Sequence, residues 1–329
     1  MSAQPTSRDL SAVQELTISD HGLTAKFLTL GSVLRSLRLE GVDHDLTLGA
    51  ADIHAYLGNF RFGGAIVGPV ANRIGMASAP LGDQRLTLLA NEGSTCLHGG
   101  PQGLDAQIWQ VIEHRPNRLT LSLSLADQED GWPGARQIKA RWWFPAPGTL
   151  ALELTATTDA PTLFAPAQHG YWRLGPGQDL TGHRLFSPAE TYTEVDAAKI
   201  PTGAMPKVEG TAFDFRGGAP VGPEASGRID HNLCISERRG ELRQVCVLQG
   251  PSARMTVHST EPGLQIYDAA HFAHRQVSDL NGKNLVAFAG LAIEPQLWPD
   301  AANQPDWQSP RLDPGETYRQ ETHWRFDAL

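Results

Sequence analysis

One acidic side chain occupies a position that suits acid–base chemistry. Glu294 follows the apolar run that ends at Ile293, and Pro295 comes directly after it. A carboxylate at the end of a buried strand is costly unless it is paired or hydrogen-bonded. Burial also raises the pKa of a carboxyl group towards the range that suits a general base near neutral pH. We therefore interpret Glu294 as a functional residue rather than a structural one.

Two histidines lie in sequence contexts that admit a ligand. His98 precedes a pair of glycines, and glycines let a ligand or a backbone segment approach closely. His169 precedes Tyr171 and Trp172, whose rings either stack on a sugar or fill a core. A lone histidine is more often packed or solvent-exposed than catalytic. On the residues alone, both interpretations therefore stay open.

Four further polar residues have the chemistry to bind hydroxyl groups. Asn72 and Arg73 follow the small, turn-prone stretch GGAIVGPVA, and a guanidinium group offers a fixed fork of N–H donors to a polyhydroxyl ligand. The simpler interpretation is that the pair caps a turn. Asp230 is equally explained as a turn residue that caps its own backbone, and Gln265 as a strand residue that faces solvent.

Several other chemistries have no support in the sequence. There is no GxGxxG after a strand, no GxxxxGK[ST], no GxSxG and no HExxH. His98, His169, His231 and Glu294 would be needed for a His₃–carboxylate metal site, but they are dispersed and no HxH pair supports one. We therefore expect neither a metal nor a cofactor.

Strands with alternating apolar side chains must carry these residues. Apolar residues alternate with polar ones over 119–125, 150–156 and 318–326, and this period of two is typical of half-buried β-strands. The 33 glycines and 23 prolines indicate many turns, one of them at 20–22. The fold class predicted is all-β, a large antiparallel β-sandwich of two packed sheets.

Two segments carry more specific predictions. The apolar run over residues 285–295 predicts one strand buried on both faces. The spacing over residues 51–58 predicts about two helical turns. No repeat or composition shift marks a boundary, so we expect a single domain over residues 1–329.

Charge and cysteine content limit the partners and the compartment. The net charge of −9 argues against nucleic-acid binding and is compatible with a small neutral substrate. The N-terminal segment lacks the features of a signal peptide, and no apolar run is long enough to span a membrane. Three scattered cysteines fit a reducing compartment. We expect a cytoplasmic protein, and a homodimer is one assembly open to it.

Taken together, the polar segments resemble the aldose 1-epimerase (galactose mutarotase) family. The resemblance runs in order through VANRIG, NEGSTCLHGGPQGLDAQIW, DQEDGWPG, AQHGYWRL, KIPTG, IDHN, EPGLQIY, IEPQLWPDAAN and LDPGETY. It covers most of the chain, from about residue 63 to residue 326. The fold that it implies is the single-domain galactose mutarotase-like β-supersandwich. The activity that it implies is the exchange of the α and β anomers of a free aldose, without a cofactor.

The resemblance also implies a role for each candidate residue. Glu294 would be the general base, His169 the general acid, and His98 would assist at the ring oxygen. The sugar hydroxyls would be bound by Arg73, Asp230 and Gln265, with Asn72 nearby. We expect Glu294 to be ionised and His169 protonated in the resting enzyme, on opposite sides of the sugar.

The chain departs from the family pattern at four positions near these motifs, namely Pro69, Trp172, Arg173 and Trp298. We expect Trp172 and Arg173 to reshape the pocket beside His169. Arg173 would also permit an acidic or phosphorylated sugar, and with the region of Arg61 it would provide cations for a sugar phosphate. A sugar-phosphate mutarotase and a non-catalytic carbohydrate-binding protein are therefore the alternative functions.

Overall fold

The computed structural model describes residues 9–329. Its largest sheet has nine strands, and each neighbouring pair is antiparallel. Their order across the sheet is β18 (Ala219–Pro220), β16 (Arg184–Phe186), β20 (Arg243–Gln249), β21 (Ala253–Ser259), β25 (Tyr318–Ala328), β12 (Thr149–Thr158), β11 (Arg136–Ala146), β10 (Arg118–Leu125) and β9 (Gln110–Arg115).

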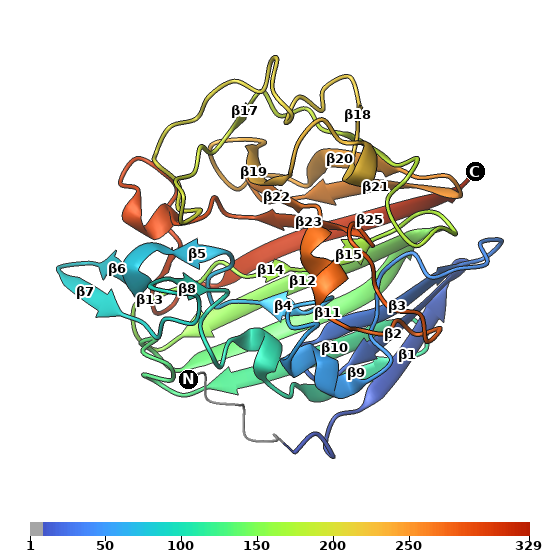
Figure 1. Ribbon diagram of the computed structural model, residues 1–329. Coiled ribbons are helices and arrows are strands. Elements are labelled where there is room, and N and C mark those ends of the chain that lie inside the picture. Colours follow the sequence, from blue (N-terminus) through green and yellow to red (C-terminus); the bar gives the residue numbers. More distant parts are fainter. Residues whose placement is uncertain (1–8) are drawn as a thin grey trace.

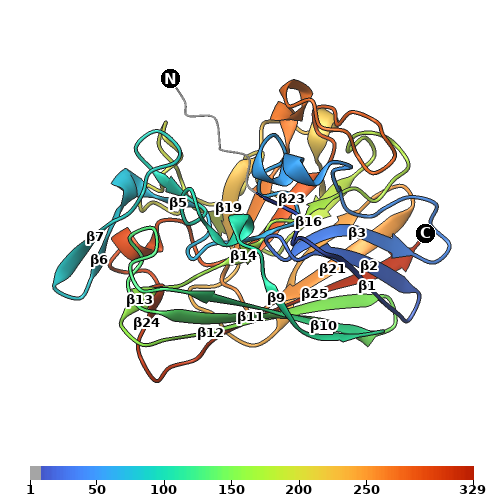
Figure 2. The same ribbon diagram turned by 90° about the horizontal axis from the view of Figure 1, so that it is seen from below.

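Two smaller sheets lie against this large sheet. One contains β1 (Glu15–Asp20), β2 (Leu23–Leu28) and β3 (Val33–Leu39). The other has the order β15 (Tyr171–Trp172), β23 (Leu291–Gln296), β22 (Gly263–Tyr267), β19 (Asp230–Cys234) and β17 (Thr191–Tyr192). Figure 1 shows the large sheet crossing the molecule, and Figure 2 shows β1–β3 stacked over it. The predicted antiparallel β-sandwich is confirmed, but two separate sheets rather than one lie against the large sheet.

Short elements connect the sheets. The two-stranded pairs are β4 (Ile66–Val67) with β14 (Ala167–Gln168), β5 (Arg73–Ile74) with β8 (Cys96–Leu97), β6 (Ser78–Leu81) with β7 (Gln84–Thr87), and β13 (Thr162–Leu163) with β24 (Arg311–Leu312). Within residues 9–329 the helical turns are all 3₁₀: η1 (Ile53–Leu57), η2 (Gly75–Ala77), η3 (Leu104–Ala106), η4 (Gly222–Glu224), η5 (Ala270–His274) and η6 (Ala301–Asn303). None of the helices in the described part of the chain is long and apolar enough to cross a membrane.

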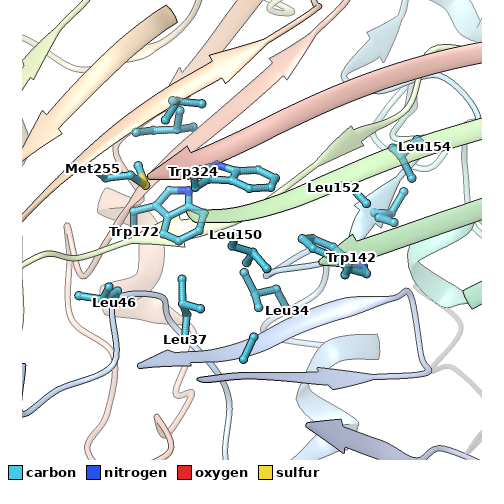
Figure 3. Close-up of a cluster of buried hydrophobic side chains, with 14 of the residues drawn as sticks. Leu34, Leu37, Leu46, Trp142, Leu150, Leu152, Leu154, Trp172, Met255 and Trp324 are labelled. Atoms are coloured by element: carbon cyan, nitrogen blue, oxygen red, sulfur yellow. The ribbon is translucent and has the colours of Figure 1, made fainter. Parts of the chain in front are cut away.

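The alternating segments form strands as predicted. Leu119, Leu121, Leu123 and Leu125 are the buried side of β10, because successive side chains of a strand point to opposite faces. The same alternation buries one face of β12 and one face of β25. These faces form the main core with residues of β2, β3, β22 and β23. Figure 3 shows part of this core, where Trp142, Trp172 and Trp324 lie among leucines of both layers.

The two specific predictions have different outcomes. The helical turns predicted over residues 51–58 are present, but as the shorter 3₁₀ helix η1 over Ile53–Leu57. It begins after Asp52, whose side chain accepts a hydrogen bond from the backbone N–H of His54 at 2.9 Å. The prediction of one strand over residues 285–295 is wrong in its first half, because the strand begins at Leu291. Phe288 has a φ of 59°, which interrupts an extended chain before Gly290.

The N-terminal residues 1–8 lie outside the described residues. These eight residues belong to the predicted domain over 1–329. They also belong to the N-terminal segment that lacks the features of a signal peptide. The division of the chain into domains stays a prediction.

Candidate active site

The register of the five-stranded sheet gathers four polar side chains on one side. Gln265 on β22 pairs with Glu294 on β23, and Tyr267 pairs with Asp230 on β19. Paired residues of neighbouring strands point to the same face, and so do residues two positions apart. These four side chains line one cavity of about 370 Å³. The residues that alternate with them along the strands, such as Leu264 and Ile293, face the main core.

Short strand pairs supply the other wall of the cavity. His169 lies between β14 and β15, where its N–H donates to the Ala65 carbonyl and its carbonyl accepts from the Gly64 N–H, both at 2.8 Å. His98 directly follows β8, which pairs with β5. Figure 1 shows β5 and β8, and β4 and β14, beside the five-stranded sheet. This wall lines the cavity with His98, His169, Asn72 and Arg73.

The structure thus brings all seven predicted residues into a single cavity. Their sequence positions span more than two hundred residues, and local patterns alone gave most of them a simpler structural explanation. Their common location is what makes a functional interpretation of each residue stronger than a structural one. Their individual roles stay predictions.

Glu294 and His169 are in contact at the base of the cavity. The Glu294 Oε1 atom lies 3.6 Å from the His169 Nε2 atom, and the two side chains are 2% and 6% exposed. The expectation that they lie on opposite sides of a sugar is therefore wrong. The adjacent arrangement has a chemical reason, since the C1 hydroxyl oxygen and the ring oxygen of a pyranose are bonded to the same carbon.

Burial shifts the pKa values of this pair in opposite directions. It raises the pKa of Glu294 well above the usual value, and repulsion from Asp230 adds to the shift. It lowers the pKa of His169 to about 4. Both shifts favour the neutral forms because burial disfavours charge. The expected resting state, an ionised Glu294 beside a protonated His169, is therefore not the favoured one. The neutral pair has the same total number of protons, with the transferable proton on Glu294 instead of His169.

A backbone hydrogen bond determines the tautomer of His98. The Asn72 N–H donates to His98 Nδ1 at 3.1 Å, so the ring proton of a neutral His98 lies on Nε2. Burial, followed by repulsion from His169, lowers the pKa of His98 well below its usual value. His98 is therefore a neutral hydrogen-bond donor. Asn72 uses its side-chain oxygen locally, to accept the Arg73 N–H at 2.9 Å.

This tautomer also bears on metal binding. One ligand atom each of His98, His169 and Glu294 lies within 4.8 Å of the others, which is close enough to suggest a metal site. A metal ligand needs a free lone pair on its ring nitrogen. In His98 the Nδ1 lone pair is used by the Asn72 N–H, and Nε2 carries the proton. His98 as it is held here does not fit the role of a metal ligand.

Two ion pairs hold the predicted hydroxyl-binding residues in place. The Arg73 guanidinium forms a two-point contact with Glu92, at 2.5 and 2.9 Å. Asp230 forms an ion pair with Lys199 and accepts a hydrogen bond from Gln265 Nε2 at 2.8 Å. Sequence reasoning missed Glu92 and Lys199 as site residues. Both lie inside motifs that carried the family resemblance, NEGST and KIPTG, and this location is the signal that could have found them.

Other lining residues were also missed. Leu97 lies inside the quoted motif NEGSTCLHGGPQGLDAQIW. The others come from segments outside the quoted motifs, and they are Phe62, Arg228, His271 and Arg275. Tyr171 and Tyr267 lie in quoted motifs, but no position in the pocket was predicted for Tyr267.

The departures from the family pattern do not reshape the pocket as expected. Trp172 is fully buried in the main core, with its ring centroid 5.8 Å from that of Trp324. The Arg173 side chain donates to the Gln178 carbonyl at 3.2 Å, and Arg173 does not line the cavity. Both residues follow His169 in sequence, but strand alternation and the end of β15 direct them elsewhere. Trp298 packs on Trp307, and Pro69 follows a cis peptide bond, so neither lines the cavity.

Fold and cavity together define an all-β sandwich protein with a buried carboxyl–imidazole pair. The family model for aldose 1-epimerase matches residues 14–325. The chain belongs to this family. It is an isomerase with mutarotase activity.

Individual relatives agree over nearly their full length. The galactose mutarotase of Rattus norvegicus is 31% identical, over 96% of this chain and 95% of its own. The aldose 1-epimerase of Escherichia coli is 27% identical, with 93% of each chain covered. The solved structure of an aldose epimerase homologue from C. elegans is 30% identical, with a TM-score of 0.88 over 97% of this chain and 100% of that chain.

Proposed function

We propose that this cavity exchanges the α and β anomers of a free aldose, with Glu294 and His169 as the proton-transferring pair. The contact between their side chains, inside a cavity lined by hydroxyl-binding groups, is the observation that carries the proposal. Anomer exchange requires a proton to leave the C1 hydroxyl and another to reach the ring oxygen. The ring then opens, the C1–C2 bond rotates, and closure gives the other anomer.

The single proton of the pair is sufficient for this cycle. In the active form Glu294 is ionised and accepts the C1 hydroxyl proton, while protonated His169 donates to the ring oxygen. Sugar hydroxyl groups that enter the cavity stabilise the negative charge on Glu294 and the positive charge on His169, because both side chains then gain hydrogen-bond partners. On closure the two residues exchange roles, and the pair returns to its initial proton count. No electrons are transferred, and we propose that no cofactor is needed.

The remaining residues position the sugar. His98 donates its Nε2 proton towards the ring oxygen, where charge changes during opening. Arg73, Asp230 and Gln265 bind the hydroxyl groups away from C1, with Asn72 holding the turn that carries Arg73. A grip on these distal groups keeps the open intermediate bound while C1 rotates. The names of the relatives support a hexose such as galactose as a substrate.

A carbohydrate-binding protein without catalysis is the weaker alternative. Such a protein needs hydroxyl-binding side chains but has no need for a buried carboxyl group in contact with an imidazole. Burial of that pair is energetically unfavourable, so its presence argues for chemistry at the site.

Substitution of either member of the pair tests the proposal. We expect Glu294→Gln and His169→Asn each to lower the rate of anomer exchange by about 10²–10⁴-fold, because each removes one proton-transfer group. Polarimetry of a freshly dissolved pure anomer measures the rate. Glu237→Gln, at an exposed position, is the matched control and should keep the wild-type rate. If either pair variant retained the wild-type rate, the role assigned to that residue would be wrong.

We also propose a cytoplasmic location. Cys96, Cys234 and Cys246 are all unpaired and buried, which fits a reducing compartment. Cell fractionation would test the location. Light scattering of the purified protein would test the homodimer, which stays a prediction.

A further inference from the structure

The cavity contains one cation that differs from the others in its partners. Among the residues that the structure describes, five Lys or Arg side chains line it. Four of them form ion pairs: Arg61 with Asp105, Arg73 with Glu92, Lys199 with Asp230, and Arg228 with Asp268. Arg275 has no carboxylate within 4.0 Å among residues 9–329. Its positive charge is therefore the one that the described side chains leave uncompensated.

The surroundings of Arg275 increase the need for a partner. It directly follows η5, the orange coil near β15 and β23 in Figure 1, and it is half-buried. Its Nη1 donates to the Asn59 carbonyl at 3.3 Å, and its guanidinium carbon lies 6.0 Å from the centroid of the Phe272 ring. Most of its five N–H donors thus remain available. A partly desolvated guanidinium with free donors favours an oxyanion as ligand.

Arg275 belongs to the histidine side of the cavity. Its charge is close enough to contribute to the lowered pKa of His169, and it also acts on the buried Tyr171 hydroxyl. Phe272 on the same turn packs against Tyr171, with ring centroids 4.9 Å apart. In the proposed reaction His169 serves the ring oxygen. That oxygen is bonded to C5, so in this proposed orientation the substituent of C5 would lie towards Arg275.

We propose that the preferred substrate is a hexuronic acid, an aldose whose C6 carboxylate is bound by Arg275. This inference rests on the proposed function, since it uses the orientation given by Glu294 and His169. A carboxylate carries one negative charge and matches one unpaired guanidinium in a two-point contact. A phosphate ester carries up to two charges at neutral pH, and the other four cations already have acidic partners.

Kinetics with paired substrates test this proposal. Anomer exchange of galacturonate, galactose and galactose 6-phosphate would be followed by polarimetry for the wild type and for Arg275→Gln. We expect the wild type to have its highest kcat/KM with galacturonate. We expect Arg275→Gln to lower the ratio of galacturonate to galactose kcat/KM by about 10–100-fold, mainly through KM, because a charge-assisted contact is lost.

Two further variants separate binding from structural effects. Arg275→Lys keeps the charge without the fork, so its ratio should lie between those of the wild type and Arg275→Gln. Arg254→Gln removes an exposed guanidinium of β21, and its ratio should equal that of the wild type.

Each contrary result has a distinct meaning. If Arg275→Gln lowered both rates equally, Arg275 would bind a neutral hydroxyl or support the fold, and the inference would be overturned. A wild type that prefers galactose 6-phosphate would overturn it in favour of a phosphate ester. A wild type that is active on galactose but not on galacturonate would overturn the inference and leave the proposed function intact. A wild type inactive on all three sugars would instead count against the proposed function.

Discussion

The hydrogen bond from the Asn72 N–H determines which ring nitrogen of His98 carries the proton. The Asn72 N–H occupies Nδ1, and burial keeps the ring neutral, so Nε2 presents a hydrogen to the cavity. A donor of this kind stabilises a developing negative charge on the substrate without a proton transfer. His98 and His169 are thus the same residue type with different tasks, because only His169 touches the carboxyl group.

Two replacements of His98 distinguish donation from proton transfer. Gln carries an amide N–H that replaces the Nε2 donor, whereas Phe keeps the ring shape without a donor. We expect His98→Gln to lower kcat/KM by about tenfold and His98→Phe by about a hundredfold or more. Polarimetry measures both. Equal losses for the two variants would show that the donor is not what His98 contributes.

At the scale of elements, strand β15 shows how two adjacent residues acquire unrelated tasks. Tyr171 lines the cavity, whereas Trp172 points the opposite way into the core between the sheets (Figure 3). Alternation of side chains along a strand produces this division. The pocket therefore depends on Trp172 only through the packing that holds β15 in place.

Replacement of Trp172 should affect stability more than catalysis. We expect Trp172→Phe to lower the free energy of unfolding by about 1–3 kcal/mol, because a smaller ring leaves a cavity beside Trp324. Denaturant unfolding measures this, and kcat/KM should stay within about twofold of the wild type. Trp143→Phe, on the partly exposed side of β11, should cost less. A large loss of activity at unchanged stability would contradict this assignment.

Local periodicity explains which elements could be predicted from the sequence. The alternating residues of β10, β12 and β25 indicate both the strands and their buried faces, since a period of two is a local property. A continuous apolar run has no such period, so the start of β23 at Leu291 could not be read from it.

The site shows the same limit of local information. Glu294 could be recognised from its buried context, but the partners of Arg73 and Asp230 could not. Glu92 reaches Arg73 only because β5 pairs with β8, and Lys199 reaches Asp230 from a separate loop. The direction of Arg173 likewise depends on where β15 ends. Such contacts follow from long-range register, which a single sequence does not specify.

For the whole molecule, the buried and half-buried histidines predict how stability depends on pH. Six histidines have pKa values lowered by burial, two of them to about 4: His98, His169, His183, His231, His258 and His271. Between pH 6.5 and about 4 the unfolded chain therefore binds more protons than the folded protein, so stability falls as the pH falls. The raised pKa values of Asp130, Glu294 and Asp300 act in the opposite direction but involve fewer groups.

We expect the melting temperature to fall by more than about 5 °C between pH 7 and pH 4. Thermal unfolding followed by circular dichroism measures it. The His169→Asn variant lacks one of the titrating groups, so its melting temperature should fall less over the same range. A melting temperature that stays constant or rises on acidification would contradict the lowered pKa values of these histidines.

Strand β25 occupies the middle of the nine-stranded sheet, between β12 and β21. The ribosome synthesises β12, β21 and every other strand of this sheet before it synthesises β25. Until then the nascent polypeptide holds two half-sheets whose facing edges have unpaired N–H and C=O groups, the kind of surface that joins other chains. Chaperone demand and aggregation during synthesis should therefore be concentrated in the interval before residues 318–328 arrive, and slowed translation of this stretch should prolong that exposure.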